Sequence, residues 1–590
     1  MSPMNPLLRT LRRRPLAAKL SFAAVGLLCA EGALAATVTN CNDTGSGSLR
    51  AAIAATGSGG TVGFSGSLSA CTITLASGEI PISVASLTIL GPASNSITID
   101  AGENSRIFNH TAYGTLSLYH LNLSHGKYRK ANAKGGCIVS SGNVALHGVQ
   151  IDTCFAYAYG TGTDKAEGGA VYAVGSVTAY NTTISSATAE GNGGATGGAI
   201  EASNVSIQYS TISGSEARFP AKAQGSGSVF AGAAVHAAGT GPISIVHSTL
   251  SDDIANGANN YFVTSTAAGG CVFGQGNIYI GASTLTGCKA AAYSKSQGGA
   301  VYANGPLTIS HSTISGAYAQ GTNGAYGGAV RARNLTMNYS TLSGNTAAPG
   351  LYGFSGNFQG GGVFLYQGSA TISNSTIDHN ASTGAGGAVF SIHANVTLNN
   401  STISGNSAIG NGSVPAGSGG IQMSGTAATL RISNSTVAFN TGDKKPSDAY
   451  LGGGVRAVGT AIIQSSIIAN NTMGGGPSDL SCNCGTPSAK TISGGNDLVM
   501  AIDPGGIAPP AGMVIVTADP HLVPLGNHGG PTRTHALNPG SPALGLGNNL
   551  ANFTNDQRGT AFPRLNAGLA DIGAYERQPN DDEIFYDGFQ

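Results

Sequence analysis

The sequence predicts an all-β fold in which the chain winds into one parallel β-solenoid. The first observation is a Gly-Gly phrase, seen in full as Gly-Gly-Ala-Val-Tyr-Ala at residues 298–303, that occurs eleven times. Its second glycine stands at positions 136, 169, 198, 270, 299, 328, 361, 387, 420 and 453, and a degraded copy is Gly232-Ala233. A repeat of roughly 26 to 37 residues is typical of stacked repeat architectures.

The second observation is another recurring phrase, in which Ser-Thr or Thr-Thr precedes an aliphatic residue. Its copies begin at Asn181, Tyr209, His247, Ala282, His311 (within the 298–316 stretch), Tyr339, Asn374, Asn400 and Asn434. Both phrases alternate apolar and small polar residues between Gly, Asn and Ser, and no window has the spacing of an amphipathic helix. The phrases therefore predict β-strands.

The third observation is the uneven spacing of the phrases. From the second glycine to the middle of the next phrase the chain always runs 13 to 16 residues, whereas the remainder of each repeat varies from 11 to 22. Strands that must keep register with the coil above explain the constrained part, and a loop on one side explains the variable part.

A column of asparagines supports stacking in register. Five consecutive repeats carry one at the same offset: Asn345, Asn380, Asn406, Asn440 and Asn470. Asn tolerates the left-handed turn conformation, and stacked Asn side chains can hydrogen-bond along the solenoid axis. The alternative is that Asn is simply common in turns.

Residues 1–35 predict a signal peptide. Five basic residues precede an apolar core at 20–28 and the small-residue cleavage signal Ala33-Leu34-Ala35. Without this segment 22 basic and 26 acidic residues remain, a balance that does not suggest nucleic-acid binding. Because no later stretch reaches the ~18 apolar residues of a membrane span, we expect an exported chain with no transmembrane span after cleavage.

Eight cysteines remain after residue 35, as expected of disulfides in an exported protein. Two pairs, each 17 residues apart, occupy the same two repeat positions, and a third pair lies near the N-terminus. The predicted bridges are Cys41–Cys71, Cys137–Cys154 and Cys271–Cys288. Cys482 and Cys484 offer too few ligands for a metal site, so a local disulfide or a loop clip is expected there.

Residues 36–130 predict an N-terminal cap and the first coils. Ser48 is the N-cap of a short helix with Leu49, Ala52 and Ile53 on one face, which would cover the open end of the first coil. Strands are expected at residues 71–75, 87–90, 97–100 and 116–123. Residues 131–476 are the regular coils.

The composition changes near residue 474. Charge and proline concentrate in residues 477–579, which predict a C-terminal cap that ends the stack with a polar outer face. After an acidic linker, residues 580–590 end in Ile-Phe-Tyr-Asp-Gly-Phe-Gln, which we interpret as a sorting tail.

Three motifs resemble those of bacterial right-handed parallel β-helix surface proteins. Ser48-Leu49-Arg50-Ala51-Ala52-Ile53 is similar to the helix of CSLREAI-type N-terminal regions, and the Gly-Gly-Ala-Val copies resemble the repeats of polymorphic outer membrane proteins. Residues 519–576 resemble the choice-of-anchor Q domain. The resemblance implies a right-handed parallel β-helix of a Gram-negative bacterium, extracellular or associated with the outer membrane, with an adhesin-like role. In the repeats, Ser-Gly-Asn replaces the companion Phe-x-x-Asn motif of the polymorphic proteins.

Enzymatic chemistry has little support in the sequence. Glycoside hydrolysis needs two facing carboxylates, and lyase chemistry needs a calcium-binding acidic cluster with a basic residue. Asp252-Asp253 is the only paired-acid site in the coils and falls where other repeats carry a turn. A hidden acidic site is best sought among Glu167, Glu190, Glu201 and Glu216, with Lys165, Arg218 and Lys222 nearby in sequence. No catalytic residues, metal site or cofactor are predicted.

Binding has more support, from the residue that follows the Val or Ile of each Gly-Gly phrase. The column reads Tyr172, Glu201, His236, Phe273, Tyr302, Arg331, Phe364, Phe390, Gln422 and Arg456. If the Val points inward, the column points outward, and Tyr172, Phe273, Tyr302, Arg331, Phe364 and Phe390 can bind sugars or a protein partner. If the Val points outward, the column is a ladder in the core. The sequence leaves both alternatives open.

Two function hypotheses follow. The first is an exported, non-enzymatic β-helix protein with an adhesin-like or surface-interaction role, whose partner is a carbohydrate or a host or cell-surface protein. The alternative is a polysaccharide lyase or glycoside hydrolase on the same scaffold, with acids brought together by the loops. The scarcity of acidic residues in the repeats favours the first.

Overall fold

The structure is a computed structural model that describes residues 36–68, 70–160, 163–220, 228–257, 265–350, 356–410, 417–425, 428–443, 452–482, 492–503, 509–579 and 581. The predicted signal peptide and, apart from Asp581, the predicted tail lie outside these residues. Within the described ranges no helix is long and apolar enough to cross a membrane.

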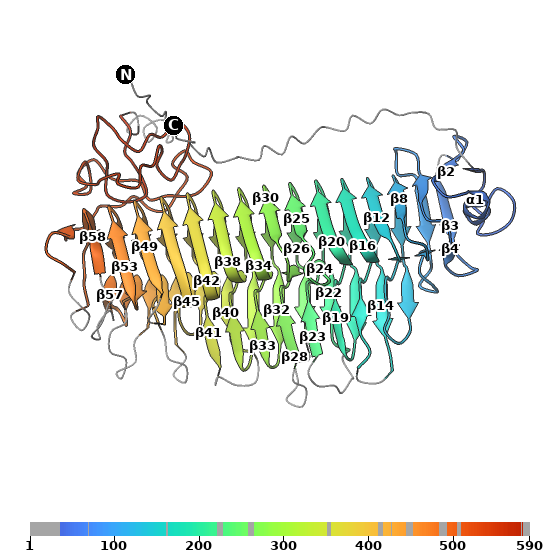
Figure 1. The fold of residues 1–590 in the computed structure, drawn as a ribbon, viewed down its shortest axis with the longest axis horizontal. Coiled ribbons are helices and arrows are strands. Elements are labelled where there is room, and N and C mark those ends of the chain that lie inside the picture. The colour runs from blue at the N-terminus through green and yellow to red at the C-terminus, as the bar shows by residue number, and fades with distance from the viewer. Residues whose placement is uncertain are drawn as a thin grey trace, which may run out of the picture.

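The predicted parallel β-helix is confirmed. One coil consists of β34 (Val301–Ser310), β35 (Thr313–Ser315), β36 (Tyr318–Gly321) and β37 (Gly324–Tyr326). These strands pair in parallel with β38 (Val330–Asn338), β39 (Thr341–Ser343), β40 (Thr346–Ala348) and β41 (Asn357–Gln359) of the next coil. Among the described residues the stacked strands form four sheets along the rod, here named A to D, with 24, 16, 13 and 7 strands (Figure 1).

The coils that include a strand of sheet D enclose apolar side chains in two separate compartments. Val301 and Ile309 of sheet A and Ile314 of sheet B point into the main core, which runs the length of the rod. Between sheets C and D lies a narrower space filled mostly by alanine, for example Ala319 and Ala325. Small residues suit this space because the two sheets lie close together.

The Gly-Gly phrase lies where these two compartments meet. The chain returning from sheet D to sheet A passes directly beside the strand that leaves sheet B for sheet C. A Cβ on Gly299 would meet the carbonyl oxygen of Gly328 and lie 2.7 Å from the backbone of Tyr318. The preceding Gly298 has φ +63°, a conformation that favours glycine. Close approach and turn geometry together explain why the phrase recurs.

The asparagine ladder is confirmed at four of its five predicted positions. The backbone N–H and the Nδ2 of Asn345 donate to Oδ1 of Asn380, at 3.0 and 2.8 Å, and the pattern continues through Asn406 and Asn440. The fifth member is Asn471, and the prediction of Asn470 was wrong. In this coil Ile467 stands where the neighbouring coil carries Thr436, so an offset counted from Ser466 falls one residue short, on Asn470, which occupies the turn with φ +59°.

A parallel ladder of serines comes from the second phrase. Backbone N–H groups donate to the Oγ of the equivalent serine in the next coil, with members Ser210, Ser248, Ser283, Ser312, Ser340, Ser375, Ser401, Ser435 and Ser466. Both ladders end at a carboxylate. Asp479 accepts from Asn471, and Asp497 accepts from the N–H of Ser466.

All three predicted disulfides are confirmed: Cys41–Cys71, Cys137–Cys154 and Cys271–Cys288. Cys271 directly follows a Gly-Gly pair, and Cys288 precedes β32 (Lys289–Ala292), so the bridge joins the two strands where they lie closest. Cys482 is disulfide-bonded as well, and Cys484 lies outside the described residues.

At the N-terminus, α1 (Leu49–Ala55) has Ser48 as its N-cap, and Leu49, Ala52 and Ile53 are buried as predicted. The predicted strands are β3 (Cys71–Thr74), β5 (Leu87–Leu90) and β6 (Ile97–Asp100). The fourth divides into β8 (Thr115–Tyr119) and β9 (Asn122–Ser124), because His120 turns the chain with φ +51°.

The C-terminal segment, residues 519–579, lies along the side of the last coils rather than across their end (Figure 1). It covers β43 (Thr376–Asp378), β46 (Thr402–Ser404) and β50 (Thr436–Ala438) of sheet B. The Oγ1 of Thr376 donates to the carbonyl of Arg533 at 2.6 Å, and Thr402 donates to Gln557 at 2.6 Å. Outward-facing hydroxyls of the coils thus supply hydrogen bonds that hold the segment.

Candidate binding surface

The column predicted for binding lies on the outer face of sheet A. Its ten members pair in register from Tyr172 to Arg456. Because the neighbouring Val171 and Val301 point into the main core, the column points away from it. It faces the corner where sheet D turns into sheet A, and we call it the corner column.

Most side chains of the corner column are already engaged with one another. The rings of Phe273 and Tyr302 stack at 4.7 Å, and the guanidinium of Arg331 lies 4.4 Å from the Tyr302 centroid. Phe364 and Phe390 are buried with Ala385 in a small cluster of their own. Burial lowers the pKa of Arg331. The column therefore lies outside the main core, as expected if the Val points inward, and its side chains are buried or half-buried by their neighbours.

Tyr172 is held in the same corner by a basic residue. The Nζ of Lys134 donates to the hydroxyl of Tyr172 at 2.8 Å and pairs with Glu167 at 2.7 Å. Desolvation of the ammonium is outweighed by these two hydrogen bonds, so the pKa of Lys134 is raised.

A second row of rings, which was not predicted as a binding surface from the sequence, is much more exposed. It lies where the strands of sheet A end and the chain turns toward sheet B, and its members are Tyr119, His147, Tyr180, Tyr209 and His247. We call it the edge stripe. Successive ring centroids are 4.6, 6.3, 5.6 and 4.9 Å apart. Tyr180 is 46% and Tyr209 54% exposed.

Two of the five members of the edge stripe, Tyr209 and His247, have a signal in the sequence, whereas Tyr119, His147 and Tyr180 end strands one position earlier. Tyr209, His247, His311 and Tyr339 each begin a copy of the second phrase, and all four adopt positive φ. A residue in this turn conformation directs its side chain away from the coil. A position that combines a ring with a turn in several repeats therefore indicates an outward-facing row.

The same turn position changes character under the C-terminal segment. There it is Asn374, Asn400 and Asn434, and each Nδ2 donates to a backbone carbonyl of that segment, at 2.8 to 3.1 Å. Tyr339 is the last ring before this region, and it lies against Gly559. This repeat position thus carries amides where the C-terminal segment covers it, whereas in four of the open coils it carries a ring and in two others it is Asn181 or Ala282.

The acidic residues singled out from the sequence do not form one site. Glu167 pairs with Lys134, Glu201 with His236 at 2.8 Å, and Glu190 and Glu216 both with Arg218, at 2.6 and 2.7 Å. Lys222 lies outside the described residues. Burial of the Arg218 guanidinium lowers its pKa, but the hydrogen bonds and charges of Glu190 and Glu216 outweigh this effect, so the pKa of Arg218 is raised. Each acid is therefore engaged with a basic side chain in its own part of the coil.

Asp252 and Asp253 point in different directions. Asp252 is an exposed turn residue with φ +56°, whereas Asp253 is fully buried, and burial raises its pKa well above the usual value. Asp253 accepts the N–H of Ser215 at 2.8 Å, which is the ladder role taken by asparagine in later coils. Among the described residues, no group of three or more His, Cys, Asp or Glu is placed to hold a metal ion.

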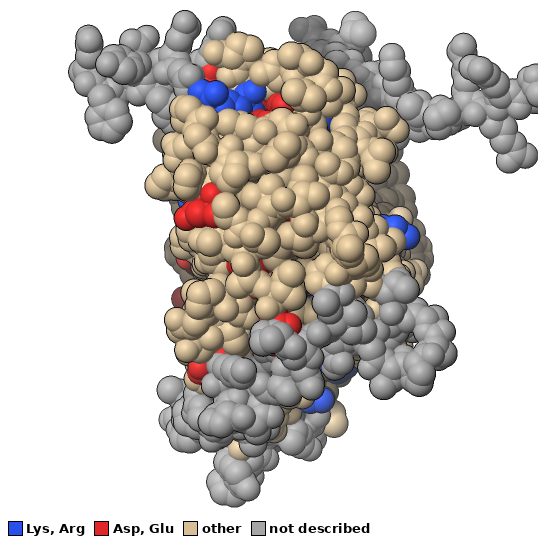
Figure 2. All heavy atoms as spheres, turned by 90° about the vertical axis from the view of Figure 1, so that its left-hand side faces the viewer, with Lys and Arg blue, Asp and Glu red and all other residues tan. Residues whose placement is uncertain are grey.

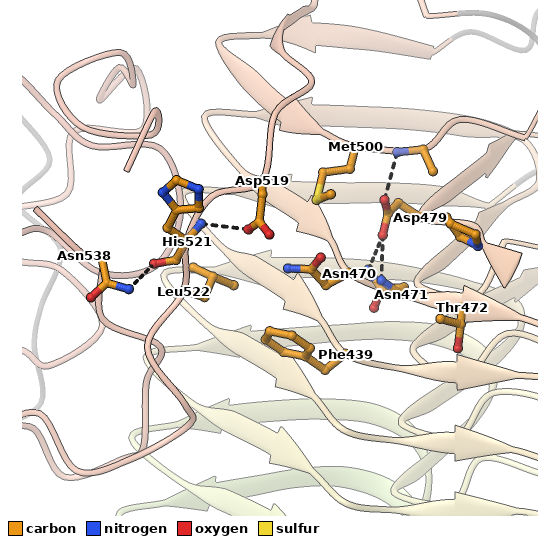
Figure 3. A pocket seen from close by; sticks show the side chains of 12 residues that line it. Phe439, Asn470, Asn471, Thr472, Asp479, Met500, Asp519, His521, Leu522 and Asn538 are labelled. Atoms are coloured by element: carbon orange, nitrogen blue, oxygen red, sulfur yellow. Dashed lines mark hydrogen bonds between the residues drawn. The ribbon is translucent and has the colours of Figure 1, made fainter. Parts of the chain in front are cut away.

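A pocket of about 870 Å³ lies between the last coils and the C-terminal segment (Figure 3). Its lining is Phe439, Asn470, Asn471, Thr472, Pro477, Asp479, Met500, Ala501, Asp519, His521, Leu522 and Asn538. Asp479 accepts hydrogen bonds from Asn471 and from the N–H of Ala501, while Asp519 accepts from the N–H of His521. Burial raises the pKa of Asp479 to about 6. Both carboxylates are engaged in holding the backbone.

Charged side chains are also sparse on the end of the rod at which this pocket lies. Figure 2 looks onto that end, and Lys, Arg, Asp and Glu occupy only scattered spots among the described atoms. Charged residues make up only 9% of the whole chain.

Comparisons with known proteins add little to this description. No protein-family model matches the chain, and no curated protein matches it. Among solved structures the chain is similar to the one titled "Crystal structure of pectate lyase Pel9A", with 13% identity over 92% of this chain and 97% of that one, and a TM-score of 0.18. A similarity of this size says nothing about chemistry. The resemblances to outer-membrane repeats and to the choice-of-anchor Q domain therefore stay predictions.

Proposed function

We propose that this chain is an exported β-helix protein that binds a surface partner along its side, in an adhesin-like role, and does not cleave it. The edge stripe is the observation that carries this proposal. Three of its five rings are exposed, successive rings lie 4.6 to 6.3 Å apart on stacked coils, and the row runs parallel to the rod axis. The three disulfides fit an oxidising compartment outside the cytoplasm.

Exposed aromatic rings on a rigid scaffold are suited to binding. Tyrosine presents a large apolar face with few rotatable bonds, so little conformational entropy is lost when a partner packs against it. Successive coils repeat about every 4.8 Å, so a long partner can meet several rings at once. We propose a carbohydrate as the partner, because a sugar offers both an apolar face and hydroxyls for the tyrosine and histidine edges.

The test is retention of purified residues 36–579 on pectate, alginate, hyaluronan and intact cells, with and without calcium. Removing two exposed anchors with Tyr180→Ala and Tyr209→Ala is expected to weaken retention about tenfold. The matched control is Tyr113→Ala with Tyr366→Ala, which removes two exposed tyrosines outside the stripe. Equal retention of the two double variants contradicts the proposal.

The same incubations distinguish binding from cleavage. Ultraviolet absorbance of unsaturated products, or release of reducing sugar, would establish a lyase or a glycosidase and overturn the non-enzymatic assignment. Tyr302→Ala tests the corner column separately. Because both neighbours of that ring are already in contact with it, we expect a smaller loss of retention than for the stripe variant.

A further inference from the structure

The first strand of sheet C presents an unusual concentration of positive charge. Residues 127–134 contain Lys127, Arg129, Lys130 and Lys134 and no acidic residue. Lys127 and Arg129 belong to β10 (Lys127–Arg129), which pairs with β14 (Phe155–Ala158), so that Lys127 lies beside Phe155 and Arg129 beside Tyr157. Ala156 and Ala158 of β14 point into the narrow compartment. The side chains that alternate with them, Phe155 and Tyr157, therefore face outward, and so do Lys127 and Arg129 beside them.

Two of these cations have no carboxylate partner within the described residues. Lys127 pairs with Glu103 at 2.8 Å, and Lys134 pairs with Glu167. Arg129 and Lys130 are exposed and take part in no ion pair there. On the next strand of sheet C, Glu190 lies beside Tyr157, and together with Glu216 it pairs with Arg218, whose guanidinium is 5.6 Å from the centroid of Phe155.

Aromatic rings hold the Arg129 guanidinium in place. Its central carbon lies 5.0 Å from the centroid of Tyr157 and 5.4 Å from that of Tyr159. The rings of Phe155, Tyr157 and Tyr159 form a row with centroid distances of 6.0 and 6.3 Å. Stacking on the rings restrains the planar guanidinium group of Arg129 and leaves its N–H donors free for an acceptor that binds two of them at once. A restrained guanidinium group loses less conformational entropy on binding than the mobile side chain of a lysine does.

We propose that Arg129 and Lys130, with the rings of Phe155, Tyr157 and Tyr159, form a binding site for the carboxylate or sulfate groups of an acidic polysaccharide. The guanidinium takes one anionic group in a bidentate contact, and the neighbouring ammonium takes a second. The row of rings spans on the order of 13 Å along the strand, enough to contact more than one sugar unit.

An acidic polysaccharide fits this surface better than a nucleic acid does. Nucleic-acid binding depends on neutralising many phosphates, and the chain after residue 35 carries 22 basic against 26 acidic residues. The proposal rests on the proposed binding function, but it concerns a different sheet and a different chemistry from the edge stripe.

The test measures the affinity of the purified protein for polygalacturonate, for dextran sulfate, for neutral dextran and for single-stranded RNA. We expect binding to the two anionic polysaccharides that weakens with salt, and little binding to neutral dextran or RNA. Arg129→Gln with Lys130→Gln is expected to weaken the anionic binding about tenfold or more, the size of a lost charge-assisted contact. Preference between the first two polymers identifies the carboxylate or the sulfate.

The matched control is Lys295→Gln with Arg333→Gln, which removes the same charge at exposed positions elsewhere. It is expected to bind within about twofold of the unchanged protein. Tyr157→Leu with Tyr159→Leu keeps Arg129 and Lys130 but removes the rings that restrain the guanidinium group. We expect an intermediate loss of affinity for the anionic polysaccharides. All three variants change surface residues, and equal thermal unfolding midpoints verify that each is folded.

Several outcomes overturn the inference. They are an equal loss in the charge variant and its control, no binding to either anionic polymer, or RNA binding as tight as polysaccharide binding. The edge-stripe variant keeps the two proposals distinguishable. If it alone loses retention, the proposed function stands and the Arg129 site is wrong, whereas loss only in the Arg129 variant contradicts the role of the stripe.

Discussion

Asp497 ends the serine ladder as a buried carboxyl group. Its Oδ1 accepts the N–H of Ser466 at 2.9 Å, and its Oδ2 receives no hydrogen bond from the described residues. Burial raises its pKa to about 8. Between about pH 4 and pH 8 the folded chain therefore holds a proton that the unfolded chain releases, and this contribution to stability is lost as the pH rises through that window.

Asp497→Asn should remove this pH dependence. At pH 9 we expect the free energy of unfolding to increase by about 1–3 kcal/mol, because the buried charge is gone, and at pH 4 little change. Thermal unfolding at both pH values measures the difference. Asp252→Asn, at an exposed turn where Asn is equally suited to positive φ, should shift neither value, and a gain of the same size at both pH values would contradict the charge explanation.

At the scale of the element, the Gly-Gly phrase does two separate things. Its first glycine turns the chain at positive φ, and its second lets two strands of one coil pass in contact. The pair sits between the main core and the alanine-lined compartment. A side chain at the second position would push these strands apart in its own coil and also in the coil stacked on it.

Gly299→Ala should therefore destabilise the protein strongly, by about 3 kcal/mol or more, since neither backbone can move away without breaking ladder hydrogen bonds. Gly344→Ala is the matched comparison. Gly344 has φ +66°, but a methyl group added there would meet no atom within 4 Å, so only turn strain of about 1 kcal/mol is expected. Chemical denaturation of both variants tests this, and equal losses would contradict the packing role.

Much of the coil was predictable because stacking in register converts sequence offsets directly into contacts. The cysteine pairs and four rungs of the asparagine ladder followed from equal spacing. Asn471 was missed because the last coil has Ile467 in place of the Thr from which the offset is counted, so that Ser466 was taken for that Thr. The burial of the corner column could not be predicted because it depends on how sheet D packs against it. Sheet D follows the loops of variable length, so its position cannot be derived from the repeat spacing. The ion pairs could not be predicted because they join side chains of neighbouring coils. These coils differ in length, and the pattern within one repeat does not show which residues of two coils become neighbours.

At the scale of the whole molecule, the C-terminal segment packs against coils that lie more than 100 residues earlier in the sequence. Arg558 is fully buried, pairs with Asp556 at 2.8 Å and lies between the rings of Phe562 and Tyr575. This cluster gives the segment its own fixed shape. Arg533 then reaches the solenoid and pairs with the buried Asp378.

Arg533→Gln should loosen the segment, because the Asp378 carboxylate loses its strongest partner while it stays buried. Destabilisation of about 1–3 kcal/mol is expected, together with faster limited proteolysis within residues 519–579. Adding Asp378→Asn to the same chain should restore resistance, since the uncompensated charge is then absent. If the double variant is cleaved as fast as the single one, the ion pair is not what holds the segment.

The two ladders also give the stack a direction. Between Ser210 and Ser466, and between Asn345 and Asn471, each coil donates backbone N–H groups to side-chain oxygens of the following coil, and both ladders end on an aspartate. Coils within this part of the stack therefore present the same donors and acceptors to their neighbours. Whole repeats can therefore be gained or lost by gene duplication without redesigning either end. Each such event changes the reach of the molecule by about 4.8 Å, which makes its length a trait that evolves in discrete steps.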